Sequence, residues 1–134
     1  MKKGFTLVEL LAVMVIISIV SIITVPTVTD LLNKNKTKLC NAQIDEIISA
    51  AKSWGTENVF SLPNNDGGSI TISLKKLSEE GYIDEKIKNP VTNGYFDLDE
   101  TVVTITKNGK KYSYTMNDSV VDTCYSNGTE KPSD

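Results

Sequence analysis

An uninterrupted apolar run near the N-terminus places the strongest limit on what this chain can fold into. Residues 5–25 contain a single charged side chain, that of Glu9. As a helix rising about 1.5 Å per residue, the run is about 30 Å long, which matches the hydrocarbon core of a bilayer. The sequence therefore predicts one transmembrane helix over residues 5–26, and it leaves room for only one small domain after it.

The charges that flank the run predict its orientation. Lys2 and Lys3 precede it, and the next basic residue is Lys34. By the positive-inside rule the N-terminus then lies in the cytoplasm, and everything after Pro26 lies outside. The alternative is an ordinary secretory signal peptide. It is disfavoured because the run is long, is interrupted by Glu9 and ends without a small-residue A-x-A cleavage site.

The residues around the single charge form a specific motif. Residues 3–10, Lys-Gly-Phe-Thr-Leu-Val-Glu-Leu, resemble the class III signal of type IV pilins and of the pseudopilins of type II secretion and competence systems. In that family a prepilin peptidase cuts after the glycine and N-methylates the new first residue. The resemblance therefore implies cleavage after Gly4 and methylation of Phe5. It also implies that Glu9 is the assembly carboxylate and that Pro26 is the helix-disrupting proline of many pilins.

Glu9 requires a partner on physical grounds as well. An ionised carboxylate at membrane depth costs several kcal/mol unless it is paired, and the run contains no lysine or arginine. Cleavage would create an ammonium on Phe5, which is four residues away and on the same helix face. Pairing with the ammonium of a neighbouring subunit would also set the axial register, and the resemblance favours this interpretation. The remaining alternative is that Glu9 extends to the cytoplasmic interface.

The end of the run is predicted to be a weak helix. Ser18, Ser21 and Thr24 recur at every third residue, and their hydroxyls can bond to preceding carbonyls and loosen the helix. Pro26 lacks an N–H group and its ring clashes with the carbonyl of Ile22, so a kink is expected there. We expect this zone to bend in the membrane and to unwind when subunits pack into a filament.

Beyond the proline, the pattern becomes that of an amphipathic helix. Six apolar residues fall within a sector of about 120° on a helix: Cys40, Ile44, Ile47, Ile48, Ala51 and Trp54. The helix is expected to be bare from about residue 27 to 39 and to pack from Cys40 onward. Gly55 is a candidate stop signal.

The rest of the chain predicts a small α+β head. The expected elements are a strand at residues 70–72, a short helix at residues 74–80 capped by Ser73, and a hairpin of residues 101–107 and 110–116 around Asn108-Gly109. Residues 95–98 are the candidate third strand. The predicted fold is a long N-terminal helix packed on an antiparallel β-meander, which resembles the pilin head. The expected parts are a leader (1–4), an apolar helix (5–26), an amphipathic helix (27–54) and a head with a flexible tail (55–134).

The composition excludes several kinds of chemistry. The 134 residues contain no histidine, which removes the usual catalytic triads and histidine metal sites. A net charge of −3 argues against direct nucleic-acid binding. Asp97, Asp99 and Glu100 lack the EF-hand glycine and glutamate, so a solvated acidic turn is expected there rather than a metal site. No enzyme activity, metal or cofactor is predicted.

The two cysteines, Cys40 and Cys124, have no metal-site or redox-motif spacing. A disulfide between them is expected if the head lies outside the cytoplasm, and two buried free thiols are the alternative.

Together these features predict a structural filament subunit, a type IV pilin. Its expected partners are prepilin peptidase, an inner-membrane assembly platform, the membrane, and other pilins in a homo- or hetero-oligomeric filament. It is expected to be a single-pass membrane protein before assembly and part of a surface filament afterwards. The alternatives are a pseudopilin of a competence or type II secretion machine, and a signal-anchored binding protein that does not polymerise.

Overall fold

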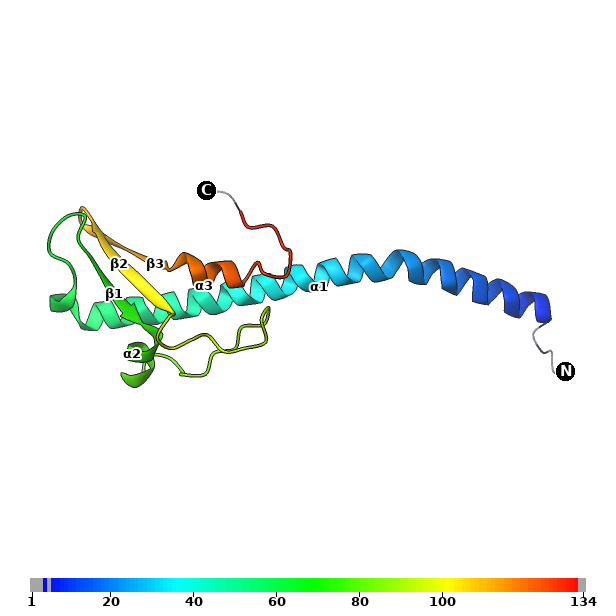
Figure 1. The fold of residues 1–134 in the computed structure, drawn as a ribbon, viewed down its shortest axis with the longest axis horizontal. Helices are drawn as coiled ribbons and strands as arrows, with labels where there is room; N and C mark the ends of the chain where they lie inside the picture. Colours follow the sequence, from blue (N-terminus) through cyan, green and yellow to red (C-terminus); the bar gives the residue numbers. More distant parts are fainter. Residues whose placement is uncertain (1–3, 5, 133–134) are drawn as a thin grey trace.

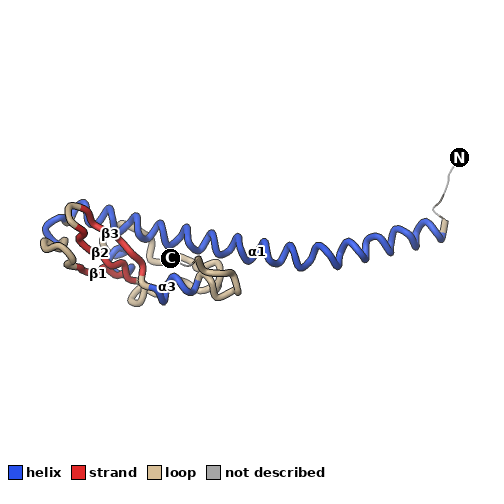
Figure 2. The backbone as a smooth tube through the Cα atoms, turned by 90° about the horizontal axis from the view of Figure 1, so that it is seen from above, coloured by secondary structure: helices blue, strands red, loops and turns tan. Residues whose placement is uncertain are grey.

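One helix accounts for the length of the molecule. The computed structural model describes residues 4 and 6–132, without the side chains of residues 21–27. Helix α1 runs without a break over Leu7–Glu57 and carries the head along its C-terminal half only (Figures 1 and 2). Thr6 caps its start, where Oγ1 accepts a hydrogen bond of 3.2 Å from the backbone N–H of Glu9. The pair Thr6 and Glu9 has the spacing of a capping box, a signal that the sequence interpretation overlooked.

The end of α1 lies two residues beyond the predicted stop. Gly55 is inside the helix, and the cap is Asn58, whose backbone N–H and side-chain amide both donate to the carbonyl of Trp54, at 2.9 and 2.8 Å. A short 3-10 helix, η1 (Val59–Ser61), follows directly. Two hydrogen bonds to one carbonyl outweigh the helix-breaking tendency of a single glycine.

The head is a three-stranded antiparallel sheet laid against α1. Its strands are β1 (Ser69–Ser73), β2 (Val102–Asn108) and β3 (Lys111–Met116), in the order β1-β2-β3. The short helices α2 (Leu74–Glu79) and α3 (Asp118–Thr123) complete it. This confirms the predicted α+β class, a long N-terminal helix with a small antiparallel sheet.

The core lies between the sheet and the predicted face of α1. Ile47, Ala51 and Trp54 are buried there, as their spacing indicated, against side chains of all three strands and of the short helices. The main buried partners are Ile72, Leu74, Leu77, Phe96, Val103, Ile105 and Met116. The buried part of α1 begins one turn earlier than expected, at Thr37. The reason is that the C-terminal segment after α3 contacts Thr37 through the carbonyl of Cys124.

Two details of the predicted sheet are wrong. The predicted strand at residues 70–72 is present as β1, and β1 completes the sheet in place of residues 95–98, where Tyr95 makes only an isolated bridge to Lys88. The hairpin turn is Gly109-Lys110, because Asn108 pairs with Lys111. Gly109, the first residue of the turn, has φ 64°. Lys110, the second, does not have positive φ, because Asn93 is the only non-glycine residue with positive φ among the described residues. This combination indicates a type II′ turn. The shift moves each pairing by two residues, so the predicted faces are unchanged: Val103 and Ile105 still lie opposite Met116 and Tyr114.

Candidate functional site

The exposed N-terminal half of α1 is the most unusual surface of the molecule. Every described side chain from Leu7 to Val20 is exposed, and most of them are large and apolar. The exposed residues of this surface are Leu7, Val8, Leu10, Leu11, Val13, Met14, Val15, Ile16, Ile17, Ile19 and Val20. Because monomeric proteins rarely expose contiguous apolar surface on this scale, the surface indicates a site that something else covers.

Glu9 is the charged group of this surface. It sits in the first turn of α1, where the helix dipole favours a carboxylate, and its side chain is exposed. Among the described residues the Glu9 carboxylate has no ion-pair partner. A cation supplied from outside the described chain could therefore reach it without displacing an existing contact.

Several predicted site residues fall outside what the structure describes. Phe5, with Lys2 and Lys3 before it, is not described, and neither is the side chain of Pro26. The kink at Pro26 and the methylation of Phe5 therefore stay predictions. Gly4 is described and exposed. Ser18 donates 2.8 Å to the carbonyl of Met14, which confirms the predicted back-bonding for this hydroxyl.

The predicted membrane span also stays a prediction. Within the described part of the chain, no helix reaches the length and apolarity needed to cross a bilayer. The predicted span of residues 5–26 includes Phe5 and several of the side chains that are not described.

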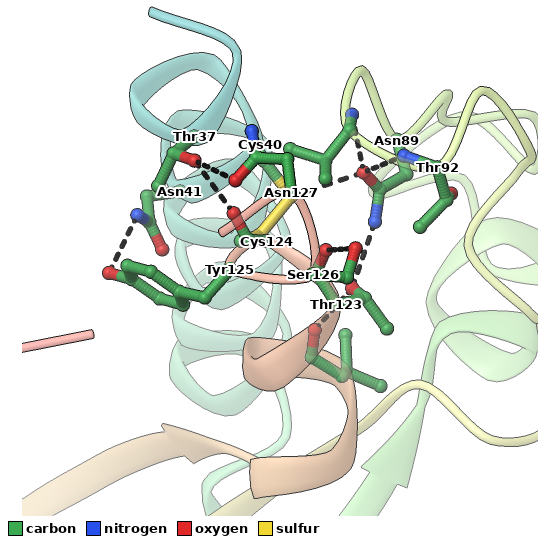
Figure 3. Close-up of a disulfide and its surroundings, with 12 residues drawn as sticks. Thr37, Cys40, Asn41, Asn89, Thr92, Thr123, Cys124, Tyr125, Ser126 and Asn127 are labelled. Carbon is green, nitrogen blue, oxygen red and sulfur yellow. Dashed lines mark hydrogen bonds between the residues drawn. A yellow bond between two sulfur atoms is a disulfide. The ribbon is translucent and has the colours of Figure 1, made fainter. Parts of the chain in front are cut away.

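At the other end of the bare segment, the head is attached to α1 through a disulfide. Cys40 and Cys124 are bridged, both fully buried, with their Cα atoms 5.5 Å apart (Figure 3). The predicted bridge is therefore present, and neither cysteine is free. It closes a segment of 84 residues that contains the whole sheet.

Hydrogen bonds around the bridge fasten the C-terminal segment to α1. The buried hydroxyl of Thr37 donates 2.8 Å to the carbonyl of Cys124, and the Asn127 amide donates 2.9 Å to the carbonyl of Asn33. The Asn41 amide donates 3.0 Å to the Tyr125 hydroxyl. Sequence reasoning missed these polar residues, because single threonines and asparagines in a lysine-rich stretch carry no pattern of their own.

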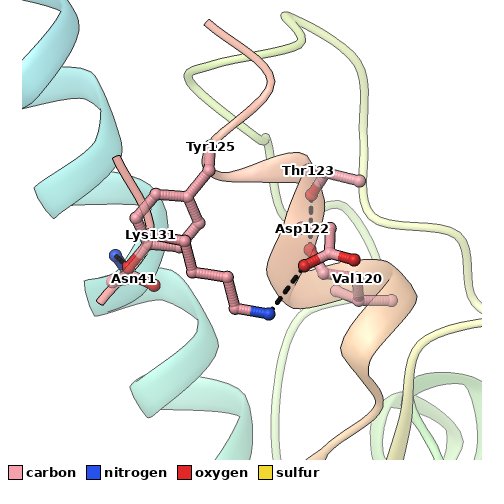
Figure 4. Close-up of polar contacts among 6 residues, drawn as sticks. All are labelled: Asn41, Val120, Asp122, Thr123, Tyr125 and Lys131. Atoms are coloured by element: carbon pink, nitrogen blue, oxygen red, sulfur yellow. Dashed lines mark hydrogen bonds and ion pairs between the residues drawn. The ribbon is translucent and has the colours of Figure 1, made fainter. Parts of the chain in front are cut away.

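The tail beyond this cluster is held more loosely. The sequence predicts a flexible tail at the end of the head. In the structure Lys131 forms an exposed ion pair of 2.7 Å with Asp122 of α3 (Figure 4). Exposed ion pairs contribute about 0 to 1 kcal/mol to the free energy of unfolding, so this pair holds the tail only weakly.

The Thr37 contact can be tested by substitution. We expect Thr37→Val to lower the free energy of unfolding by about 1 to 2 kcal/mol. Valine has nearly the shape of threonine, but the buried carbonyl of Cys124 loses its hydrogen-bond donor. Chemical denaturation measures this. The control is Thr56→Val, which removes an exposed hydroxyl bond on the same helix and should change little. Equal effects of the two variants would contradict the assignment.

The acidic segment of residues 97–100 is a local turn. The Asp97 carboxylate accepts the backbone N–H groups of Asp99 and Glu100, at 2.8 and 2.9 Å. Within the part of the chain that the structure describes, no three acidic or cysteine side chains gather closely enough to hold a metal ion. The arrangement is that of an Asx turn.

Comparison with known proteins identifies the N-terminal segment. Residues 1–25 match the family described as the prokaryotic N-terminal methylation motif. No curated protein and no solved structure matches the chain, so the likeness of its head to pilin heads stays a prediction. The matched segment contains Gly4, Phe5 and Glu9 and extends through the exposed apolar half of α1. The chain thus carries at its N-terminus the class III signal of type IV pilins and pseudopilins.

Proposed function

We propose that this protein is the precursor of a type IV pilus subunit that assembles through the N-terminal half of α1. The observation that carries the proposal is the coincidence of two features: the methylation motif covers residues 1–25, and the described side chains of that segment from Leu7 onward are exposed and mostly apolar. A processing signal and a surface that needs covering thus occupy the same residues. The proposed role is structural rather than catalytic.

The first step is removal of the leader. Prepilin peptidase cuts after Gly4 and methylates the new N-terminus at Phe5. This reaction changes the charges at one end of α1, because it replaces an amide with an ammonium four residues from Glu9. The subunit then carries both a cation and an anion close to its apolar surface.

The second step is assembly in register. The Glu9 carboxylate of one subunit pairs with the Phe5 ammonium of the next. If the amine lies level with Glu9, the neighbour is displaced by about 6 Å along the axis, since four residues of helix rise about 1.5 Å each. In apolar surroundings an unpaired carboxylate is costly, so misaligned neighbours are disfavoured and one stagger is selected.

The apolar surface is covered in two successive ways. Before assembly, lipid surrounds residues 5–26 with the head outside the membrane. After assembly, the equivalent helices of neighbouring subunits replace the lipid. The assembly platform of the inner membrane carries out the exchange, and the head ends at the surface of the filament.

Processing is the direct test of this proposal. We expect Gly4→Val to leave the chain uncleaved, whereas the wild type begins at N-methylated Phe5. The block would arise at the peptidase, because a Cβ on Gly4 meets no described atom within 4 Å and the fold has no need of a glycine there. Intact-mass and N-terminal mass spectrometry of chain expressed with prepilin peptidase distinguish the two forms.

The matched control is Thr6→Ser, which changes a neighbouring residue and keeps the hydroxyl that caps α1. It should be processed like the wild type. A wild-type chain that retains its leader in the presence of active peptidase would overturn the proposal. Electron microscopy of sheared cell surfaces then separates a surface pilus from a short envelope pseudopilus or an anchored monomer.

A further inference from the structure

The head exposes an apolar tip at the end farthest from the N-terminus. The tip consists of Val59 and Phe60 in η1, which begins one residue after the cap at the end of α1. Figure 1 shows this end of α1 at the far end of the molecule from the N-terminus. Phe60 is exposed to 102% of its reference area, more than any other large apolar residue described, and Val59 is 56% exposed. Large side chains of this kind supply much of the binding energy in protein interfaces, so Phe60 is a candidate contact residue.

The backbone of the tip is held in place on both sides, although its side chains are exposed to solvent. On one side Asn58 holds the turn by two hydrogen bonds to the Trp54 carbonyl. On the other side Leu62 is buried in the core, and the next carbonyl, that of Pro63, accepts 3.0 Å from the Tyr112 hydroxyl of β3. Phe60 therefore projects from a short turn fixed at both ends, so little conformational freedom is lost when it binds.

A groove of complementary character lies at the opposite end of the head. It has a volume of about 380 Å³ and is lined mainly by Leu39, Pro90 and the side chains of Lys36 and Lys88. Leu39 is 54% exposed although it neighbours the buried Cys40. Buried Asn89 fixes the turn that carries Pro90, because its Oδ1 accepts the backbone N–H groups of the two residues after the proline, at 2.9 and 3.2 Å.

Exposed apolar side chains also lie on α1 below the groove. Val28, Leu32 and Leu39 are all exposed. At about 100° per residue they fall within about 40° of one another on α1. These three apolar side chains therefore share one face of α1, and Leu39 of this face lines the groove.

We propose that the Val59–Phe60 tip of one subunit docks into the Leu39–Pro90 groove of a second copy of this chain. Charge favours this occupant, because exposed Glu57 precedes the tip whereas Lys36 and Lys88 border the groove. Tip and groove are different surfaces at opposite ends of the head. Their contact is therefore heterologous, and repeating it gives an open helical array rather than a closed dimer.

The inference rests on the proposed filament and is consistent with its stagger. Leu39 and Phe60 are 21 residues apart. At about 1.5 Å per residue this is roughly 30 Å along the axis, or about five steps of about 6 Å. The tip therefore meets the groove of a subunit several places along the filament, and the heads form a continuous outer layer.

Cross-linking in filaments tests the contact. The variant Val59→Cys/Lys36→Cys places one thiol in the tip and one on the rim of the groove, while Phe60 and Leu39 stay in place. The native bridge leaves no free thiol, so a short bismaleimide reacts only at the new sites. We expect a ladder of oligomers well beyond the dimer on a reducing gel. The control Lys110→Cys/Lys36→Cys, with its first thiol at the hairpin turn, should give none.

A second measurement tests the tip itself. Phe60→Ala should reduce filament yield on the order of tenfold, as for a central interface residue. Lys75→Ala, which changes an exposed residue of α2 outside tip and groove, should not. Intact filaments without a ladder, or a ladder that ends at the dimer, would overturn this inference and leave the proposed function standing. If the wild type formed no filaments, the proposed function would fail and this inference with it.

Discussion

Replacing Glu9 with leucine is expected to lower the number of assembled filaments by at least about tenfold while the head remains folded. In the isolated chain the Glu9 carboxylate has no ion-pair partner among the described residues, and its side chain is exposed. In the proposed filament it neutralises a neighbour's ammonium in apolar surroundings. Removing one member of a buried ion pair costs about 3 to 5 kcal/mol, because the other charge is left uncompensated. Counting filaments by electron microscopy measures the effect.

The matched control is Glu46→Leu. Glu46 is an exposed carboxylate on the same helix, but it lies within the head. This variant should assemble normally if the loss with Glu9→Leu is due to the pair and not to a general change in charge. Processing of Glu9→Leu at Gly4, followed by mass spectrometry, separates assembly from cleavage. Filaments of Glu9→Leu at the wild-type level would refute the intersubunit pair.

Removing the disulfide is expected to have the largest effect on stability. In the chain-entropy account, a bridge closing 84 residues stabilises the fold by about 4 to 5 kcal/mol. Measured effects of removing a native bridge are about 2 to 5 kcal/mol, which is comparable with the whole stability of a small domain. We therefore expect Cys40→Ala/Cys124→Ala to unfold at a much lower denaturant concentration.

The single tryptophan provides the signal. Trp54 is buried between α1 and the sheet, so its fluorescence reports unfolding of the head in the full-length chain. Reducing the wild type should reproduce the loss without creating a cavity. Reductant should not affect the double variant. An unchanged midpoint after complete reduction would contradict the assigned role of the bridge.

The elements that the sequence predicted well are those with a strong local pattern. The buried face of α1 repeats over four turns, and Ser73 stands at the start of a short helix, where its hydroxyl accepts from the backbone N–H of Lys76. The two strands of the hairpin were located correctly. The turn was placed wrongly, but the residues on each face of the hairpin were predicted correctly, because the register shift is an even number of residues.

The features that were missed, one helix and the pairing of one predicted strand, depend on distant contacts. Helix α3 has only six residues, and Val120 is its one buried side chain, so its formation depends on the neighbouring bridge at Cys124 more than on propensity. The choice of β1 as the third strand depends on a partner strand some thirty residues away. The pairing of Glu9 cannot be seen in the structure of one subunit, because its proposed partner belongs to another molecule.

The position of the disulfide also determines how the subunit bears mechanical load. Pulling between the lower part of α1 and the C-terminal tail transmits tension from Cys40 to Cys124 across a covalent bond. The chain between them, which spans a sequence separation of 84, forms a side loop that carries no tension, and all three strands lie in it. Tension applied between α1 and the tail therefore bypasses the sheet, and the stability of the sheet does not limit the strength of this path.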